Sequence, residues 1–157
     1  MTVTGMMVGT PSYMPPEQAE AKRTDERSDV YGLGATLYEL VAGRPPFTGQ
    51  NAIDIAMSVI QSDPERPTRV RSAVPLELET IILKAMEKDP ARRYPSAQAF
   101  AEDLRRHLEG EPILARPSSL VTRAAKWAKR NRATSAAMAV VFAGLVLVVV
   151  AVAVSKA

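Results

Sequence analysis

The sequence predicts an all-α fold that is followed by one strongly apolar helix near the C-terminus. Three observations support this prediction. Apolar residues recur at helical spacing in four segments between residues 29 and 109. Proline and glycine separate these segments from one another. No stretch alternates convincingly between apolar and polar residues, as a half-buried strand would.

The first predicted helix covers residues 29–42 and is apolar on nearly all sides. A helix of this kind is normally buried at the centre of a domain. Ser28 or Asp29 is a suitable N-cap, and Gly43 is expected to end the helix just before a pair of prolines.

Three further helices are expected. Asn51 can cap the first, the second follows Pro75, and the third starts at Ser96 and is closed by Gly110. His107 lies on the third helix and is expected to be a half-buried structural residue. The expected buried faces consist of Ile53, Ala56, Met57 and Ile60 in the first helix, Leu78, Ile81, Ile82, Ala85 and Met86 in the second, and Phe100, Leu104 and Leu108 in the third.

Two rare residue types exclude several classes of function. The chain has no cysteine, which excludes a disulfide framework, thiolate metal sites and a cysteine nucleophile. It has one histidine, which excludes a multi-histidine metal site and disfavours a histidine-based catalytic triad. We therefore expect no metal-binding residues in this chain.

Charge is segregated along the chain. Residues 1–111 contain 13 Lys and Arg against 17 Asp and Glu, a net charge of −4, whereas residues 112–157 contain seven basic residues and no acidic one. A basic surface that binds nucleic acid would be expected on a folded face with aromatic or polar groups that read bases. Here the basic residues adjoin an apolar run instead, so we expect no nucleic-acid partner.

Residues 133–155 form this apolar run, which has 23 residues and no charge. About 20 apolar residues span the hydrocarbon core of a bilayer as a helix. A buried helix of a small domain would be shorter, and a signal peptide would lie at the N-terminus. We therefore predict a single transmembrane helix at residues 133–155, preceded by a basic juxtamembrane linker at residues 112–132.

The flanking charges predict the orientation of this span. Five basic residues lie within residues 123–132, against Lys156 alone on the other side. Because positive flanks stay in the cytoplasm, residues 1–132 are expected to be cytoplasmic and the C-terminus to lie outside. The chain is thus predicted to be a single-pass membrane protein.

Residues 9–17 read Gly-Thr-Pro-Ser-Tyr-Met-Pro-Pro-Glu, which resembles the end of the activation segment in eukaryotic-like serine/threonine protein kinases. Three later motifs, at residues 29–34, 44–47 and 88–94, resemble the start of the buried helix, the loop after it, and the segment with a buried arginine in that family. Bacterial members often continue into a basic stretch and one membrane span. The resemblance implies that residues 1–111 are a partial kinase domain, comprising the end of the activation segment and the helical C-terminal lobe.

This resemblance assigns roles to individual residues. Thr10 would face the catalytic aspartate and help select serine or threonine as the acceptor. Thr2 and Thr4 match activation-loop threonines that such kinases phosphorylate on themselves, which adds negative charge that can order the loop. The pocket for the substrate residue just after the acceptor would be formed by Pro11, Ser12 and Tyr13.

The resemblance also implies structural roles. Glu17 and Arg93 would form a buried ion pair, and Asp29 would hydrogen-bond the catalytic loop. Pro15 stands where the family motif usually has alanine, a mild change that leaves the glutamate in place.

A complete kinase of this family would use ATP and Mg²⁺ and act on protein substrates, with self-association for phosphorylation in trans. The 157 residues contain no Gly-rich phosphate loop, no His-Arg-Asp and no Asp-Phe-Gly motif. We therefore expect no catalytic, cofactor-binding or metal-binding residue here. The expected function is that of the C-terminal part of a membrane-anchored serine/threonine kinase, inactive as this fragment. The alternative is a non-catalytic, membrane-tethered helical module for binding or scaffolding.

Overall fold

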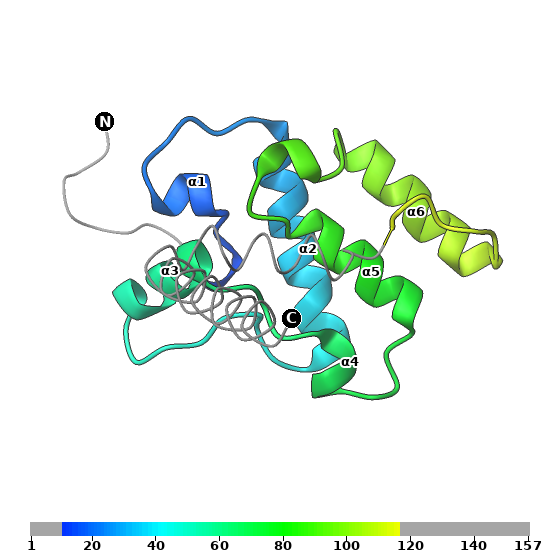
Figure 1. Ribbon diagram of the computed structural model, residues 1–157, viewed down its shortest axis with the longest axis horizontal. Helices are drawn as coiled ribbons and strands as arrows, with labels where there is room; N and C mark the ends of the chain where they lie inside the picture. Colours follow the sequence, from blue (N-terminus) through cyan, green and yellow to red (C-terminus); the bar gives the residue numbers. More distant parts are fainter. Residues whose placement is uncertain (1–10, 117–157) are drawn as a thin grey trace, which may run out of the picture. The chain divides into compact units, whose positions relative to one another are not determined.

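The computed structural model describes residues 11–116. The chain divides into two units, residues 1–117 and 118–157, and the described residues all belong to the first. Within this part the elements, in chain order, are η1 (Pro11–Tyr13), α1 (Pro16–Ala19), α2 (Glu26–Ala42), α3 (Ala52–Gln61), α4 (Pro67–Val70), α5 (Leu76–Ala85), η2 (Pro90–Arg92) and α6 (Ala97–Glu109) (Figure 1).

Residues 11–116 contain helices and 3₁₀ turns and no strand, which confirms the predicted all-α class for this part of the chain. The transmembrane helix predicted at residues 133–155 lies outside the described residues. Among the residues that are described, no helix combines the length and the apolar character needed to cross a bilayer.

Helix α2 lies at the centre of the described part and contacts α4, α5, α6 and η1 (Figure 1). It begins at Glu26, because the Asp25 side chain accepts a hydrogen bond from the backbone N–H of Arg27 at 2.9 Å. The prediction of an N-cap at Ser28 or Asp29 was therefore wrong. Gly43 ends the helix as predicted, in a left-handed conformation with φ of 78°.

One side of α2 is more exposed than predicted. Leu33 is 47% exposed and Leu40 is 72% exposed, although the sequence indicated a helix that is buried on nearly all sides. The neighbouring elements contact other positions around the helix, among them the fully buried Val30, Tyr31 and Ala35. Within the described residues the two leucines are therefore only partly covered.

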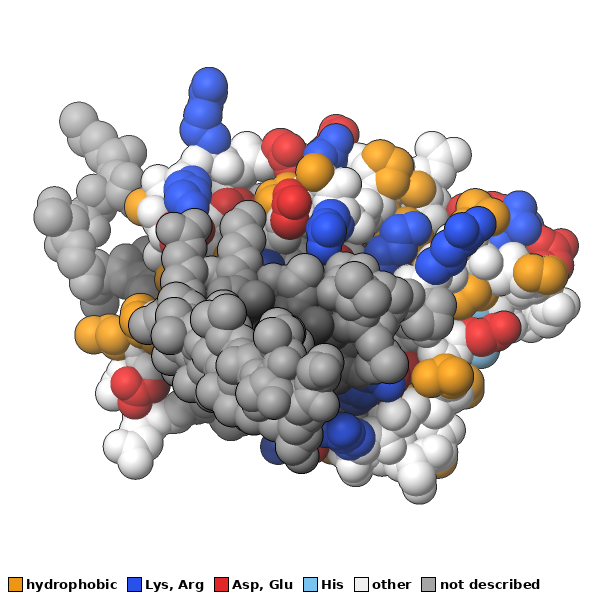
Figure 2. All heavy atoms as spheres, viewed as in Figure 1, with side chains coloured by type: hydrophobic (Ala, Val, Ile, Leu, Met, Phe, Trp, Pro, Cys, Tyr) orange, Lys and Arg blue, Asp and Glu red, His pale blue; other side chains and the backbone are white. Residues whose placement is uncertain are grey.

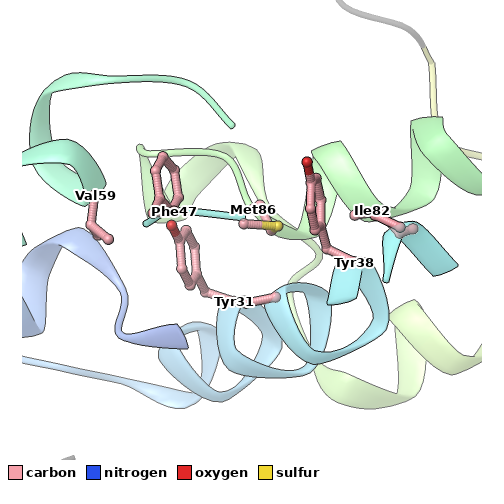
Figure 3. Close-up of a cluster of buried hydrophobic side chains, with 8 residues drawn as sticks. Tyr31, Tyr38, Phe47, Val59, Ile82 and Met86 are labelled. Atoms are coloured by element: carbon pink, nitrogen blue, oxygen red, sulfur yellow. The ribbon is translucent and has the colours of Figure 1, made fainter. Parts of the chain in front are cut away.

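The main hydrophobic cluster lies between α2 and α5. Figure 3 shows Tyr31 and Tyr38 of α2 with Met86 between them. Ile82 lies at the Tyr38 end of the cluster, and Phe47 and Val59 lie at the Tyr31 end. Gly34 allows the two helices to approach closely, because a Cβ atom at this position would lie 2.7 Å from the Cβ of Ala85. The sequence therefore places a glycine where the two helices cross, and this contact anchors the core.

The caps of the later helices agree with the sequence, but two of the buried faces do not. Asn51 caps α3, Ser96 caps α6 and Gly110 ends α6 with φ of 72°. The face of α3 that packs inward consists of Ile55, Ala56 and Val59, so of the expected set Ala56 is buried as predicted and Ile60 is half-buried. The prediction was wrong for Ile53, Met57 and Leu108, which are exposed.

The α3 and α6 errors have the same physical cause. Helical spacing identifies an apolar stripe, but it does not show how wide the neighbouring elements are. Helix α3 packs against η1 and α1, and α6 extends beyond the edge of α5. His107 is half-buried, as predicted, and its Nδ1 lies 3.1 Å from the Glu77 carboxylate.

A second hydrophobic cluster joins α2, α5 and α6. It consists of Val30, Ile81, Ala85, Tyr94, Phe100 and Ala115, with the Tyr94 and Phe100 rings meeting edge to face. Ala115 is only 4% exposed. The packed part of the chain therefore extends past residue 111, where the sequence placed the end of the domain.

Candidate functional site

The turn at Pro11–Tyr13 is fixed by contacts on both of its sides. It is closed by a hydrogen bond from Met14 N–H to the Pro11 carbonyl at 3.2 Å, and it contacts α2 and α3. The Ser12 side chain is buried. Tyr13 is half-buried, and its hydroxyl donates a hydrogen bond to the carboxylate of Glu39 on α2. This turn is therefore tied to the central helix.

The partner of Tyr13 also changes its acidity. The hydrogen bond to Glu39, together with partial burial and the negative charge of that carboxylate, raises the pKa of Tyr13 above its usual value of 10.0. The phenol therefore stays neutral at physiological pH and remains a hydrogen-bond donor. Sequence reasoning missed Glu39, because it is 26 positions from Tyr13 and no local pattern links the two.

Helix α1 follows the turn directly. Pro15 is its N-cap residue, with φ of −71° and ψ of 154°, and Pro16 occupies the first helical position, where a missing N–H has no cost. Both prolines are buried. The departure from the family motif at Pro15 therefore fits the local backbone, and it leaves Glu17 in the first turn.

Glu17 and Arg93 form a bidentate ion pair, although they are 76 positions apart. Arg93 Nη1 lies 2.7 Å from Glu17 Oε1, and Arg93 Nη2 lies 2.7 Å from Glu17 Oε2. Glu17 is 7% exposed and Arg93 is 4% exposed. The structure thus brings together the two residues that the family resemblance implies as a pair.

The rest of the Arg93 guanidinium is also bonded. Its Nε donates to the Glu87 carbonyl at 2.7 Å, and its two terminal nitrogens donate to the carbonyls of Arg27 at 2.9 Å and Lys88 at 3.3 Å. With the two bonds to Glu17, the guanidinium makes five hydrogen bonds, equal to its number of N–H donors. This group therefore joins α1, the start of α2 and the segment before η2.

The Glu17 carboxylate stays ionised in this environment. Burial raises the pKa of Glu17, but the hydrogen bonds from Arg93 and from the Ser28 hydroxyl, at 2.7 Å, lower it by more, and the pKa falls below its usual value of 4.5. Two opposite charges therefore remain buried together at neutral pH. Ser28, which the sequence suggested as a helix cap, instead supports this carboxylate.

The other residues that the resemblance singled out are placed as follows. Thr2, Thr4 and Thr10 lie outside the described residues. Asp29 lies in the first turn of α2. Its side chain is exposed and makes no hydrogen bond with the other residues of the range 11–116. The roles expected for these four residues stay predictions.

Within residues 11–116, no group of three or more His, Asp or Glu side chains is arranged to hold a metal ion. What the described residues present is a turn with a buried serine and a neutral tyrosine, bonded to the central helix.

Comparison with known proteins identifies relatives of this chain. It matches the protein kinase domain family over residues 2–104. It is 39% identical over 113 residues to a probable serine/threonine-protein kinase of Streptomyces coelicolor, and 40% identical over 112 residues to serine/threonine-protein kinase PknB of Mycobacterium tuberculosis. These matches cover 72% and 71% of this chain but only 17% and 18% of the relatives, so the chain spans less than a fifth of their length.

Proposed function

The chain belongs to the protein kinase family, and on that premise we propose that it forms the helical, substrate-side part of a membrane-anchored serine/threonine kinase. The complete enzyme transfers phosphate from ATP to serine or threonine residues of proteins, as a step in signal transduction. The Pro11–Tyr13 turn meets the substrate chain beside the acceptor residue.

The observation that carries this proposal is the Glu17–Arg93 pair beside the turn. Two residues separate the turn from α1, so the ion pair that holds Glu17 also restrains the chain just after the turn. The Tyr13–Glu39 hydrogen bond restrains the turn itself. Catalysis of phosphoryl transfer depends mainly on positioning and electrostatic stabilisation. A rigid turn supports a role in holding the acceptor segment in one position.

The exposed face of α2 supports a larger catalytic lobe. Leu33 and Leu40 are seven positions apart, so they lie on one side of the helix, with the half-buried Leu37 between them. Burying apolar surface is favourable by about 25 cal/mol per Å². This face suits a further part of the lobe packed against α2, one that also carries the groups for ATP and Mg²⁺.

The membrane part of the proposal is supported by the charge pattern of residues 112–132 and the apolar run at residues 133–155. A reporter that is active only outside the cytoplasm should work when it is fused after Ala157 and fail when it is fused near Arg116. The opposite pattern, or recovery of the whole chain in the soluble fraction, would overturn the membrane part alone.

The catalytic part of the proposal is tested with a chimera. Residues 1–111 replace the matching segment of the PknB kinase of Mycobacterium tuberculosis, which supplies the rest of the kinase. We expect the chimera to phosphorylate a serine peptide and, through self-association, its own Thr2 and Thr4, as read by mass spectrometry. Arg93→Ala should abolish peptide phosphorylation, whereas the matched control Arg92→Ala, whose side chain is exposed, should not.

One outcome separates this proposal from the alternative function, and a second tests the proposed inactivity of the 157-residue chain. A chimera that folds and binds ATP but phosphorylates no peptide would favour a non-catalytic binding or scaffolding module. In the unmodified 157-residue chain we expect no binding of ATP–Mg²⁺ and no autophosphorylation, since the motifs that hold the nucleotide are not among its residues. Measurable ATP affinity of that chain would contradict its proposed inactivity.

A further inference from the structure

The last described residues turn back along α6. After α6 ends at Gly110, the chain reverses and residues 113–115, which we call the strap, lie beside the helix (Figure 1). Ile113 and Ala115 pack into the second hydrophobic cluster, whereas Leu114 between them is 62% exposed. The strap therefore has an inner and an outer side, as an extended segment that is docked on a surface would have.

Asp103 of α6 holds the strap through its backbone. The side chain of Asp103 is fully buried. Its Oδ1 accepts a hydrogen bond from Leu114 N–H at 2.6 Å, and its Oδ2 accepts one from Ala115 N–H at 2.8 Å. The Tyr94 hydroxyl donates a third hydrogen bond, to Oδ2 at 2.8 Å. Both carboxylate oxygens are thus satisfied.

The charge of Asp103 makes this contact important. In the described part of the chain, no Lys or Arg forms an ion pair with this carboxylate. A buried carboxylate that lacks a cationic partner is tolerated only where hydrogen bonds replace its hydration. Two of the three hydrogen bonds come from the strap. The burial of Asp103 and the docking of the strap therefore depend on each other.

We propose that Asp103 is the anchor of a releasable joint: it docks residues 113–115 on α6, and the strap opens locally while the helices stay folded. The strap places two side chains, Ile113 and Ala115, against the hydrophobic cluster, and Leu114 is exposed. A segment with few apolar contacts opens at a lower free energy than core helices do. The joint thus lies between the lobe and everything that follows Arg116.

The joint sets how far the lobe reaches from the following segment. With the strap docked, the packed part of the lobe includes residue 115; with the strap released, it ends near residue 110. Five extended residues add roughly 17 Å. This consequence rests on the proposed membrane anchor, but the docking and release of the strap do not.

Hydrogen exchange of the full 157-residue chain in detergent micelles tests the joint. In the wild type, the amides of Leu114 and Ala115 should be protected, but less than those of Gly34 and Ile82 in the core helices, and low urea should leave their exchange unchanged. Unprotected strap amides, or strap amides that exchange only with the core, would overturn the proposal.

Asp103→Asn adds a second readout, because the amide group loses the charge and replaces one acceptor with a donor. Exchange at Leu114 and Ala115 should become about tenfold faster or more, while core amides keep their rates. The control Asp89→Asn alters an exposed cap at η2 and should change neither set. Unchanged strap amides in Asp103→Asn, or equal loss of protection in the core, would overturn a separate joint anchored by Asp103.

Discussion

Two groups of ion pairs in this chain use the same residue types in opposite surroundings. The Arg93 side chain is fully buried and pairs with Glu17, 76 positions away. The Arg105 side chain on α6 is 43% exposed and pairs with Glu102, Glu109 and Glu111, which lie within six positions. In Figure 2, acidic, basic and apolar side chains are interspersed over the surface formed by α6.

This difference shows which charges define the fold. The Arg105 pairs with Glu102 and Glu109 follow from helical spacing of three and four residues, which brings such side chains together in any exposed helix. Exposed pairs contribute little because water and salt screen them. The Arg93 pair needs three separate segments to be in place, so it depends on the fold and supports it.

Removing the buried arginine should have the largest effect. Arg93→Ala leaves Glu17 as an uncompensated buried charge, which costs about 3–5 kcal/mol. Domain stability is only about 5–15 kcal/mol, so the variant should lose a large share of its stability and be largely unfolded if the wild type lies at the low end of that range. Urea melts of the 157-residue chain in micelles, followed by circular dichroism, measure this. The control Arg92→Ala should change stability by no more than about 0.5 kcal/mol. Equal, small effects of the two substitutions would show that the Arg93 ion pair does not stabilise the fold.

Removing the buried carboxylate charge should have a smaller, pH-dependent effect. Glu17→Gln removes the counter-charge of the buried Arg93 but keeps one acceptor oxygen for the guanidinium, so it should cost about 1.5–3 kcal/mol at pH 7. The folded-state pKa of Glu17 is below its usual value of 4.5, so its contribution is complete above pH 4.5 and is lost as the pH falls through the lower folded-state pKa. The stability difference between wild type and Glu17→Gln should therefore shrink on acidification. A constant difference would show that the charge is not involved.

Two glycines of α2 differ in the space around them, so the same substitution should have opposite effects on stability. Gly34→Ala should destabilise by about 1–2 kcal/mol, because the new Cβ would lie 2.7 Å from Ala85 Cβ and 3.1 Å from Met86 Cγ. Among residues 11–116, the new Cβ of Gly32→Ala meets only the Tyr13 carbonyl, at 4.0 Å, so this variant should be more stable by about 0.5–1 kcal/mol through helix propensity. Thermal melts distinguish the two. A stabilising Gly34→Ala would show that α2 and α5 are less tightly packed than described.

Local chemistry made part of the fold predictable. The caps at Asn51 and Ser96 and the glycines at positions 43 and 110 act on neighbouring backbone groups, so the sequence alone indicated them. The start of α2 was missed because Asp25, Ser28 and Asp29 can all cap a helix, and the sequence does not show which of them does. Exposure of Leu33 and Leu108 was missed because apolar periodicity does not show which neighbours cover a face.

The candidate site was predictable only where a family motif carried it. Glu17 and Arg93 were paired by resemblance, since no local pattern links residues so far apart. Glu39, Ser28 and Asp103 were missed for the same reason: their partners lie 26, 11 and at least nine positions away, and the contacts exist only after the helices pack. The expected roles of Thr2, Thr4 and Thr10 stay predictions.

A pair of double-mutant cycles tests most directly whether the Glu17–Arg93 pair organises this lobe. Free energies of unfolding are measured for Glu17→Gln, Arg93→Lys and the double variant, and likewise for Glu102→Gln, Arg105→Lys and their double variant. Arg93→Lys keeps the charge but loses the bidentate geometry. The account predicts a coupling energy of about 1–3 kcal/mol for the buried pair and a much smaller one for the exposed pair. Equal couplings in the two cycles would contradict it.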